Sequence, residues 1–151
     1  MTRFSGVVLV DGQGRLLLQE RDEHAPIDPD KWGFCGGHLE PGEDFLVGAH
    51  RELEEETGLR PADLGITLEL VGEYTVFHAH TGTDDVMRLF AAQCDLTDAD
   101  VDCREGRRIV FVDVERARAL DLTAAAKAAL PSFLASERYA AWSAGEGGPC
   151  I

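Results

Sequence analysis

The sequence predicts an α/β fold in which helices pack against a mixed β-sheet. Most of its regular segments are short apolar runs of strand length, separated by turn residues. Only two segments have a helical pattern, one after the third strand and one near the end of the chain. Because the 151 residues show no internal repeat and no linker, we expect one domain over residues 1–142 and a frayed, flexible tail over 143–151.

The first part of the chain has the pattern of a β-hairpin followed by a short strand. Residues 5–10 and 15–21 are rich in apolar side chains, and Asp-Gly-Gln-Gly at 11–14 supplies the turn between them. Residues 22–31, with two prolines and mixed charge, have the composition of a loop. Residues 32–37 are long enough only for a brief strand.

A helix is expected from about Asp44 to Thr57. The dipeptide Pro41-Gly42 breaks the preceding segment, and Gly58 stands where a left-handed C-cap belongs. The glutamates of the stretch RELEEETG therefore lie on a helix.

The second half is expected to contain three strands and a last helix. The strand-like runs cover residues 66–79, 86–94 and 108–114. Helical spacing of apolar residues runs from about 123 to 142, and Pro131 should kink this helix because proline has no amide hydrogen to donate.

Acidic residues outnumber basic residues by 28 to 14, which gives a formal net charge of −14. This charge disfavours binding to nucleic acid or to an anionic membrane. An anionic substrate would need compensating positive charge at its binding site. No apolar run approaches the ~18 to 20 residues that span a bilayer, and the start of the chain lacks the pattern of a signal peptide. Widely spaced cysteines indicate reduced thiols in a cytoplasmic protein.

Three of the clustered glutamates share one side of the expected helix. At about 100° per residue, Glu52, Glu55 and Glu56 fall within an arc of about 100°. The fourth, Glu54, faces elsewhere. The arc borders an apolar stripe that should press on the sheet, formed by Leu46, Ala49 and Leu53.

Like charges at this spacing repel, and the cost grows as a site leaves water. When a divalent cation is bound, the clustering of these carboxylates becomes favourable. Hard cations such as Mg²⁺ take oxygen ligands, usually a few carboxylates together with water and substrate phosphates. From the spacing alone, the alternative is a solvated acidic helix face.

The residues around the glutamates fit a longer pattern. Between Gly37 and Leu59 the chain reads Gly-x5-Glu-x7-Arg-Glu-U-x-Glu-Glu-x-Gly-U, where U is a bulky aliphatic residue. This is the signature of the Nudix hydrolases, which the chain resembles at every specified position. The matching residues are Gly37, Glu43, Arg51, Glu52, Leu53, Glu55, Glu56, Gly58 and Leu59.

The resemblance implies a fold, an activity and a cofactor. The family's fold is an α/β/α sandwich, with a mixed sheet between helices. Nudix enzymes hydrolyse a diphosphate linkage in a nucleoside diphosphate joined to another group, using Mg²⁺ or Mn²⁺ and an attacking water. The implied partner is a small-molecule nucleotide, and a homodimer is ordinary for the family.

Carried over by position, Glu52, Glu55 and Glu56 resemble the family's metal carboxylates. The catalytic base stays open, since within the family it comes either from the signature or from a loop beyond it. Glu55 represents the first option. Glu105, just before the strand expected at 108–114, represents the second, as base or as a further metal ligand, although a polar turn between strands has the same composition.

Glu43 and Arg51 correspond to a structural ion pair of the family, between the loop and the helix. Arg51 also precedes Glu55 by four residues, a spacing at which it can orient that carboxylate, so its expected part in catalysis is indirect. Gly37 lets the loop bend where a side chain would clash, and Gly58 is the structural cap of the helix.

Four residues are candidate substrate contacts, each with a plainer reading. Arg104 and Arg107 are candidates for phosphate, or ordinary residues of a polar turn. Trp32 offers a ring face for stacking on a base, or packs in the core. Tyr74 stands roughly where the branch acting on dinucleoside polyphosphates carries a tyrosine, although core packing is the plainer reading.

His78 and His80 share one face of an expected strand and have a spacing that suits a metal, but two exposed histidines near a turn are the plainer reading. For the whole protein, the leading hypothesis is a metal-dependent hydrolase. The first alternative is a non-catalytic nucleotide-binding module, and the second is an acidic interaction or Ca²⁺-binding surface. The sequence leaves the substrate open among nucleoside triphosphates, nucleotide sugars, ADP-ribose and dinucleoside polyphosphates.

Overall fold

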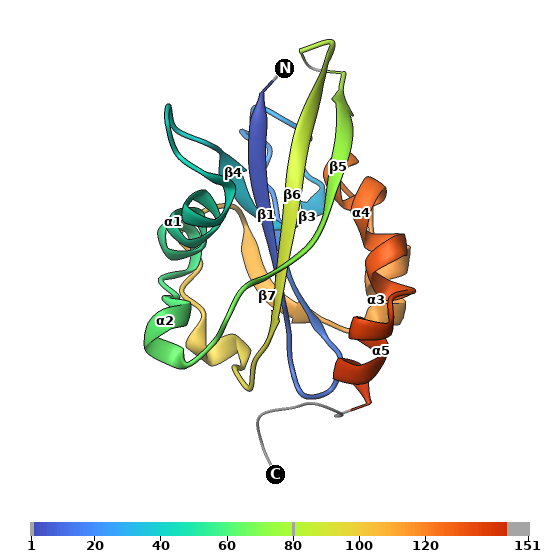
Figure 1. The fold of residues 1–151 in the computed structure, drawn as a ribbon. Helices are drawn as coiled ribbons and strands as arrows, with labels where there is room; N and C mark the ends of the chain where they lie inside the picture. Colours follow the sequence, from blue (N-terminus) through green and yellow to red (C-terminus); the bar gives the residue numbers. More distant parts are fainter. Residues whose placement is uncertain (1, 80, 145–151) are drawn as a thin grey trace.

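The structure, a computed structural model, describes residues 2–79 and 81–144. In this part of the chain, seven strands form one sheet (Figure 1). β1 and β6 run parallel and the other paired strands run antiparallel, so the sheet is mixed. The strands are β1 (Arg3–Val10), β2 (Leu16–Glu20), β3 (Trp32–Gly33), β4 (Cys35–His38), β5 (Glu69–His78), β6 (Thr83–Gln93) and β7 (Arg108–Val112).

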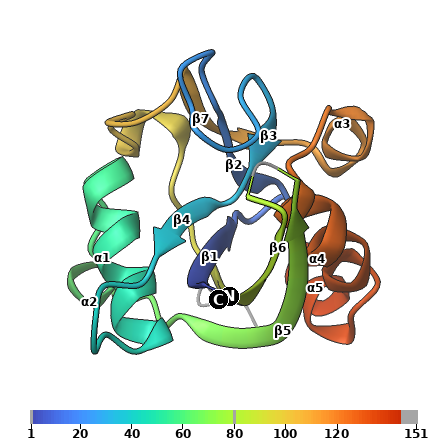
Figure 2. The same cartoon turned by 90° about the horizontal axis from the view of Figure 1, so that it is seen from above.

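Helices cover both faces of the sheet. They are α1 (Phe45–Thr57), α2 (Pro61–Leu64), α3 (Val114–Ala119), α4 (Ala124–Leu134) and α5 (Glu137–Ser143), and a 3₁₀ turn, η1, spans Asp98–Asp100. Figure 2 shows α1 and α2 on one side of the sheet and α3, α4 and α5 on the other. The expected sandwich of helices around a mixed sheet is therefore confirmed.

The core is divided into two clusters, one under each helical layer. On β1, Val8 and Val10 belong to the cluster that includes α4, whereas Val7 and Leu9 belong to the cluster that includes α1. Successive side chains of a strand point to opposite faces, so the apolar run at residues 7–10 of this central strand serves both clusters. The position of β1 in the middle of the sheet follows from this unbroken apolar run.

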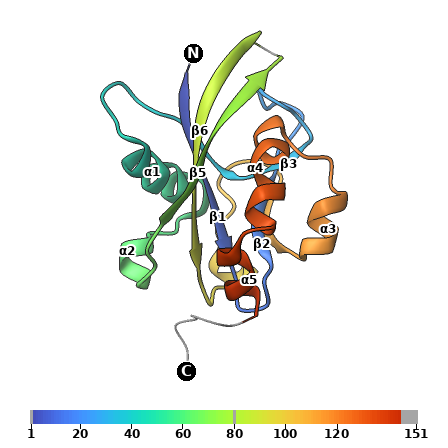
Figure 3. The same cartoon turned by 45° about the vertical axis from the view of Figure 1, so that its right-hand side comes forward.

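Both hairpins of the sheet are antiparallel. The expected hairpin of β1 and β2 is confirmed, and the Asp11 carboxylate stabilises its turn by accepting hydrogen bonds from the amides of Gln13 and Arg15, each at 2.9 Å. β5 and β6 form a longer ribbon that extends past the end of α4 (Figure 3).

The helix α1 begins and ends close to the expected residues. The Asp44 carboxylate accepts a hydrogen bond from the Val47 amide at 2.8 Å, and Gly58, with φ of 75°, donates to the Glu54 carbonyl. One member of the expected apolar stripe is wrong, because Leu46 is 43% exposed. It lies in the first turn, where the neighbouring Phe45 packs into the core instead.

The last helix differs from the expectation. Instead of one helix kinked at Pro131, the structure has α4 and α5, which are separated at Ala135 and Ser136. Pro131 removes one amide donor near the end of α4 without ending it. The Ser136 hydroxyl accepts a hydrogen bond from the Tyr139 amide at 3.1 Å and so begins a new helix.

Two short helices lie beyond the elements expected from the sequence. β7 ends at Val112 rather than at residue 114, because the Asp113 carboxylate accepts from the Glu115 amide at 3.0 Å and caps α3. Pro61 opens α2, and β5 begins at Glu69 rather than at residue 66.

Of the tail expected at 143–151, Ser143 is the last residue of α5, and residues 145–151 lie outside the described residues. Within the described part of the chain, none of the helices has the length and apolar character needed to cross a membrane.

Candidate active site

A cavity of about 580 Å³ lies among α1, β1, β4 and the chain segments at 21–28 and 105–106. Glu52 and Glu56 line it from α1, and Glu105 lines it from the loop before β7. This volume is in the range of sites for small molecules. The cavity is therefore the candidate site, and three of the glutamates named from the sequence meet there.

The glutamates of α1 occupy different environments. Glu56 is only 3% exposed, and Glu52 is largely buried. Glu55 is 57% exposed and does not line the cavity. The carboxylate arc thus reaches into the buried face of α1, where Glu56 lies beside Ala49 and Leu53.

Two glycines of β4 bring the backbone against these carboxylates. Gly36 donates its amide hydrogen to Glu56 Oε1 at 2.8 Å. Its φ is +144°, and an added Cβ would stand 2.0 Å from the Ser5 carbonyl oxygen, so no other residue fits there. At Gly37, an added Cβ would stand 2.7 Å from the Glu52 carboxyl carbon. The Glu52 carboxylate therefore occupies space that a side chain at Gly37 would take.

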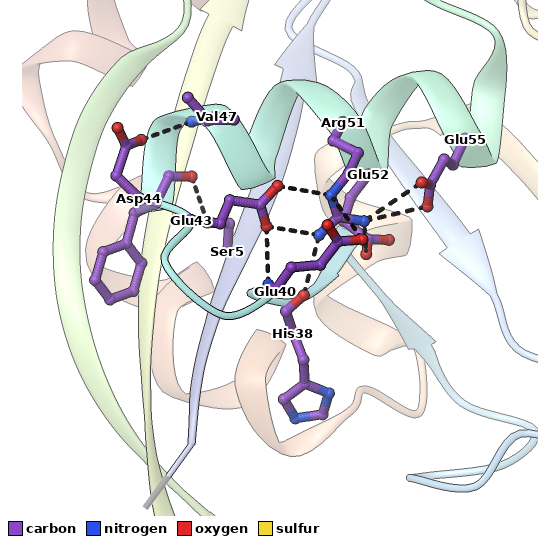
Figure 4. Close-up of polar contacts among 10 residues, drawn as sticks. Ser5, His38, Glu40, Glu43, Asp44, Val47, Arg51, Glu52 and Glu55 are labelled. Carbon is purple, nitrogen blue, oxygen red and sulfur yellow. Dashed lines mark hydrogen bonds and ion pairs between the residues drawn. The ribbon is translucent and has the colours of Figure 1, made fainter.

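Arg51 connects the loop before α1 to the glutamates (Figure 4). Its guanidinium donates to both oxygens of Glu43, at 2.7 and 2.8 Å, and to Glu52 Oε1 at 2.8 Å. It also lies 3.3 Å from Glu55 and donates to the His38 carbonyl at 3.2 Å. The hydrogen bonds from Arg51 lower the pKa of Glu43 to about 2. One arginine thus orients two glutamates of α1 and fastens the loop to the helix.

The ionisation of the cavity glutamates is perturbed. Burial raises the pKa of Glu56, and the adjacent side chain of Glu105 raises it further, against the opposing Gly36 amide. Burial also raises the pKa of Glu52, against the opposing hydrogen bond from Arg51. The ionised forms of these carboxyl groups are therefore disfavoured in this part of the cavity, and a cation placed there would stabilise them.

The donor set suits a hard divalent cation, because carboxylate oxygens are the ligands that Mg²⁺ and Mn²⁺ prefer. Within residues 2–79 and 81–144, however, no three histidine, cysteine or carboxylate side chains have the arrangement of a ready-made metal site. The fit rests on the chemistry of the converging carboxylates and on their raised pKa values.

The loop at 102–106 is fastened to the end of α1. The Arg104 amide donates to the Glu56 carbonyl at 2.8 Å, one of the carbonyls that the end of a helix leaves without a partner. From β2, Gln19 Nε2 donates to the Glu105 carbonyl at 3.1 Å. These two hydrogen bonds explain why Glu105, far from α1 in sequence, lies next to Glu56.

The two arginines proposed as phosphate contacts are paired with carboxylates outside the cavity lining. Arg104 donates to Asp102 at 2.8 Å, and its guanidinium lies over Gly58. Arg107 pairs with Asp30 at 2.7 Å and with two glutamates at residues 20 and 23. Their contact with a substrate stays a prediction.

The two aromatic candidates also lie outside the cavity lining. Trp32 is buried in the core cluster under α4, and the Arg108 guanidinium lies over its ring at 5.0 Å. Tyr74 packs against the same cluster, and its hydroxyl lies 3.1 Å from the Ser132 hydroxyl. As substrate contacts, both stay predictions.

The cavity contains side chains that the sequence patterns did not single out. Arg21 follows the last residue of β2, lines the cavity and donates to the Ile27 carbonyl. Phe4 lines it as well. The available signal for Arg21 was a basic residue directly after a buried strand, where side chains at the strand end meet a loop.

The expectation that His78 is exposed is wrong. His78 is 6% exposed, and its Nδ1 lies 2.5 Å from Asp85 Oδ2. Alternation along β5 places it on the same face as the buried Val76. His80 lies outside the described residues.

The fold and this cavity define an α/β/α protein whose glutamate-bearing helix packs against a glycine-rich strand. A sequence model of the family described as NUDIX domain matches residues 2–133. The chain belongs to this family.

The matches to known relatives cover only part of each relative's length. The RNA pyrophosphohydrolase of Caulobacter vibrioides is 46% identical over 59 residues, which are 39% of this chain and 33% of that protein. An isopentenyl-diphosphate Delta-isomerase of Pectobacterium atrosepticum is 37% identical over 93 residues, which are 55% of this chain and 52% of that protein. The chain thus spans between a third and about half of the length of these two relatives.

Among solved structures, an Ap4A hydrolase of C. elegans has a TM-score of 0.70 at 23% identity. The match covers 96% of this chain and 99% of that chain, so it shows that the two share a fold over nearly their whole length.

Proposed function

We propose that this protein is a metal-dependent hydrolase that cleaves the diphosphate linkage of a nucleoside diphosphate derivative. The observation that carries the proposal is the convergence of Glu52, Glu56 and Glu105 on one cavity, next to the β4 glycines. Family membership and the two hydrolases among the relatives support the same reaction class.

The proposed cofactor is Mg²⁺ or Mn²⁺, with Glu52, Glu55 and Glu56 as ligands. When bound, such a cation neutralises phosphate oxygens and activates a water molecule for attack. Glu52 and Glu56 already face the cavity, and Arg51 holds Glu52 in its orientation. Glu55 follows Glu52 by three residues on the same side of α1 and contributes from the rim.

Glu105 is the proposed general base. It is exposed, lines the cavity and lies on a loop that is fastened to α1 and to β2. An exposed carboxylate can take a proton from water and pass it to solvent. Glu55 is the alternative base, but it is paired with Arg51 at 3.3 Å and does not line the cavity.

We expect Glu105→Gln to lower kcat by roughly a hundredfold or more. Glutamine keeps the size of the side chain but cannot take a proton, and the fold should be retained because one of two neighbouring carboxylates is lost. Profiles of kcat against pH for the wild type and the variant test this. Asp102→Asn, in the same loop, is the matched control. An unchanged rate at every pH would show that Glu105 has no part in catalysis and would leave Glu55 as the base.

Gly37→Ala should reduce kcat by roughly ten- to a hundredfold with little loss of stability. The new methyl group would stand 2.7 Å from the Glu52 carboxyl carbon and displace a flexible side chain rather than the backbone. Turnover and thermal unfolding of the same preparation test the two parts. Gly12→Ala is the control, since its Cβ would meet nothing within 4 Å. Full turnover in Gly37→Ala would show that catalysis does not need Glu52 at this position.

We further propose that a small-molecule nucleotide, rather than nucleic acid or a membrane, is the partner, and that the enzyme works in the cytoplasm as a homodimer. The net charge of −14 supports the first point. A single domain over residues 1–142 is proposed, in line with a family match that extends to residue 133.

A substrate panel tests the proposed reaction. It contains nucleoside triphosphates, nucleotide sugars, ADP-ribose, dinucleoside polyphosphates and isopentenyl diphosphate, each with Mg²⁺, with Mn²⁺ and with chelator. We expect chelator-sensitive release of phosphate products from at least one nucleotide. Metal-dependent nucleotide binding without turnover would favour the non-catalytic module, and isomerised isopentenyl diphosphate would favour the activity named for the Pectobacterium relative.

A further inference from the structure

A second part of the cavity is built around a buried histidine. His78 of β5 and Asp85 of β6 are only 6% and 2% exposed, and Nδ1 of the ring lies 2.5 Å from Oδ2 of the carboxylate. His78 lines the cavity that contains the glutamates. A buried ionisable pair is costly to retain, and the hydrolytic chemistry proposed above does not use it.

Asp85 fixes the orientation of the histidine ring. Its Oδ1 accepts the Thr2 amide at 2.9 Å and lies 3.4 Å from the Thr83 hydroxyl. Although burial opposes its charge, hydrogen bonds from His78 and Thr2 keep the pKa of the Asp85 carboxyl well below its usual range. An ionised carboxylate can only accept, so Nδ1 carries the hydrogen, and in the neutral form of such a ring Nε2 is the acceptor.

The ring of His78 borders the cavity, and Asp85 occupies its Nδ1 side. Among the described residues, no hydrogen bond reaches its Nε2 atom. Because His78 lines the cavity and Asp85 engages its Nδ1, Nε2 is the ring nitrogen that a bound ligand could reach.

An aromatic surface adjoins this acceptor. The Phe4 ring lies near the rings of both His78 and His38, with centroid distances of 5.5 and 5.8 Å. All three side chains line the cavity. Aromatic faces accommodate flat rings in offset stacks, and an acceptor at their edge suits a flat ring that carries an N–H group.

The strand register separates this acceptor from the glutamates. Gly36, which binds Glu56, pairs with Gly6, and Gly6 pairs with Leu89 of β6. Asp85 lies four residues before Leu89 on the same strand, which is about 13 Å at ~3.3 Å per residue. His78 therefore borders a part of the cavity that lies further along the sheet than the contact between Gly36 and Glu56.

We propose that His78, positioned by Asp85, recognises the base of the nucleotide by accepting a hydrogen bond at Nε2. The inference rests on the proposed function and names the part of the substrate that this end of the cavity selects. It predicts that the site distinguishes nucleotides from base-free sugar phosphates.

Binding measured without turnover tests the proposal. In Asp85→Asn the amide can donate to Nδ1, which moves the hydrogen to Nε2 and turns the acceptor into a donor. We expect the affinity for the best-bound nucleoside monophosphate to fall about tenfold, and that for ribose 5-phosphate to change less than twofold. His78→Gln should have the same selective effect. Glu73→Gln, the same chemical change at an exposed site on β5, should change neither affinity.

A second measurement uses the wild-type protein and does not depend on the folding of a variant. Nitrogen NMR of the histidine side chains should show Nδ1 protonated in His78, and its Nε2 resonance should shift with nucleoside monophosphate but not with ribose 5-phosphate. Three results would overturn the proposal: an equal fall in affinity for both ligands in the variants, an unchanged affinity for both, or an Nε2 resonance that does not shift at saturation with nucleoside monophosphate.

These outcomes are distinct from a failure of the proposed hydrolysis. A protein that binds nucleotides selectively through His78 but hydrolyses none would support the base contact and contradict the enzyme. A hydrolase whose variants keep wild-type discrimination between the two ligands would contradict the base contact alone.

Discussion

Replacing Glu56 by glutamine should lower turnover roughly a thousandfold while the fold stays intact, because several kcal/mol of charge stabilisation would be lost with the carboxylate. Glutamine can still accept the Gly36 amide, which lies 2.8 Å from Oε1 in the wild type. Its amide can donate to the adjacent Glu105. Since burial disfavours the charge of Glu56, the free energy of unfolding at neutral pH should be unchanged or higher. The measurements are kcat with Mg²⁺ and urea unfolding.

The matched control for this variant is Glu54→Gln. Glu54 is on the same helix but exposed and outside the cavity lining, where it pairs loosely with Arg60 at 3.9 Å. Its turnover should stay within about twofold of the wild type. Near-normal turnover in Glu56→Gln would remove Glu56 from the metal ligands, and a change of similar size in both variants would point to the net charge of the helix instead.

Arg51→Met should destabilise the protein by about 2 kcal/mol and also lower turnover. The change leaves the carboxylates of Glu43 and Glu52 without their partner in a partly buried position, and breaking such a pair costs more than losing a surface contact. Urea unfolding at pH 7 measures the first effect. The exposed Arg60→Met, which loses pairs with Glu54 and Asp63, should cost less than about 0.5 kcal/mol.

The Arg51 contribution should depend on pH. Arg51 lowers the pKa of Glu43 to about 2 in the folded protein, below the ordinary value of 4.5. A carboxyl with a depressed pKa stabilises the fold above its unfolded pKa, and this contribution is lost as the pH falls through the folded pKa. The difference in unfolding free energy between wild type and Arg51→Met should therefore shrink from about pH 4.5 towards pH 2. A difference that stays constant over this range would contradict the assigned pair.

The glutamate helix was predictable because its geometry is local. Asp44 and Gly58 bound α1 through hydrogen bonds within a few residues, and the 100° periodicity groups Glu52 with Glu56. The depth of Glu56 was not predictable in the same way. It depends on the Gly36 amide, 20 residues earlier in the chain, and on how closely β4 approaches α1.

The rest of the cavity depends on contacts that the sequence does not display. Arg107 is basic, but its partner Asp30 lies 77 residues away, so its pairing outside the cavity is invisible to spacing. His78 is buried because Asp85 stands across the β5–β6 ribbon from it. Side-chain partners set by tertiary packing decide whether a polar residue faces a ligand or another residue.

The break between α4 and α5 shows two local rules in competition. Proline in a helix favours a kink at Pro131, and a serine hydroxyl favours a new helix at Ser136. The structure follows the second, since α4 continues through Pro131 to Leu134 and Ser136 caps the separate helix α5. The sequence alone does not show which of these two signals prevails.

Manganese binding and turnover, measured on the same samples, test directly whether the glutamates hold the cation that the reaction uses. As Mn²⁺ is added to the metal-free wild type, the electron paramagnetic resonance signal of free Mn²⁺ should fall below that of buffer, and turnover of the best substrate should rise with the bound fraction. Glu56→Gln should lose both. Turnover that persists in excess chelator, or Mn²⁺ binding that is unchanged in a Glu52→Gln, Glu56→Gln double variant, would contradict the metal assignment.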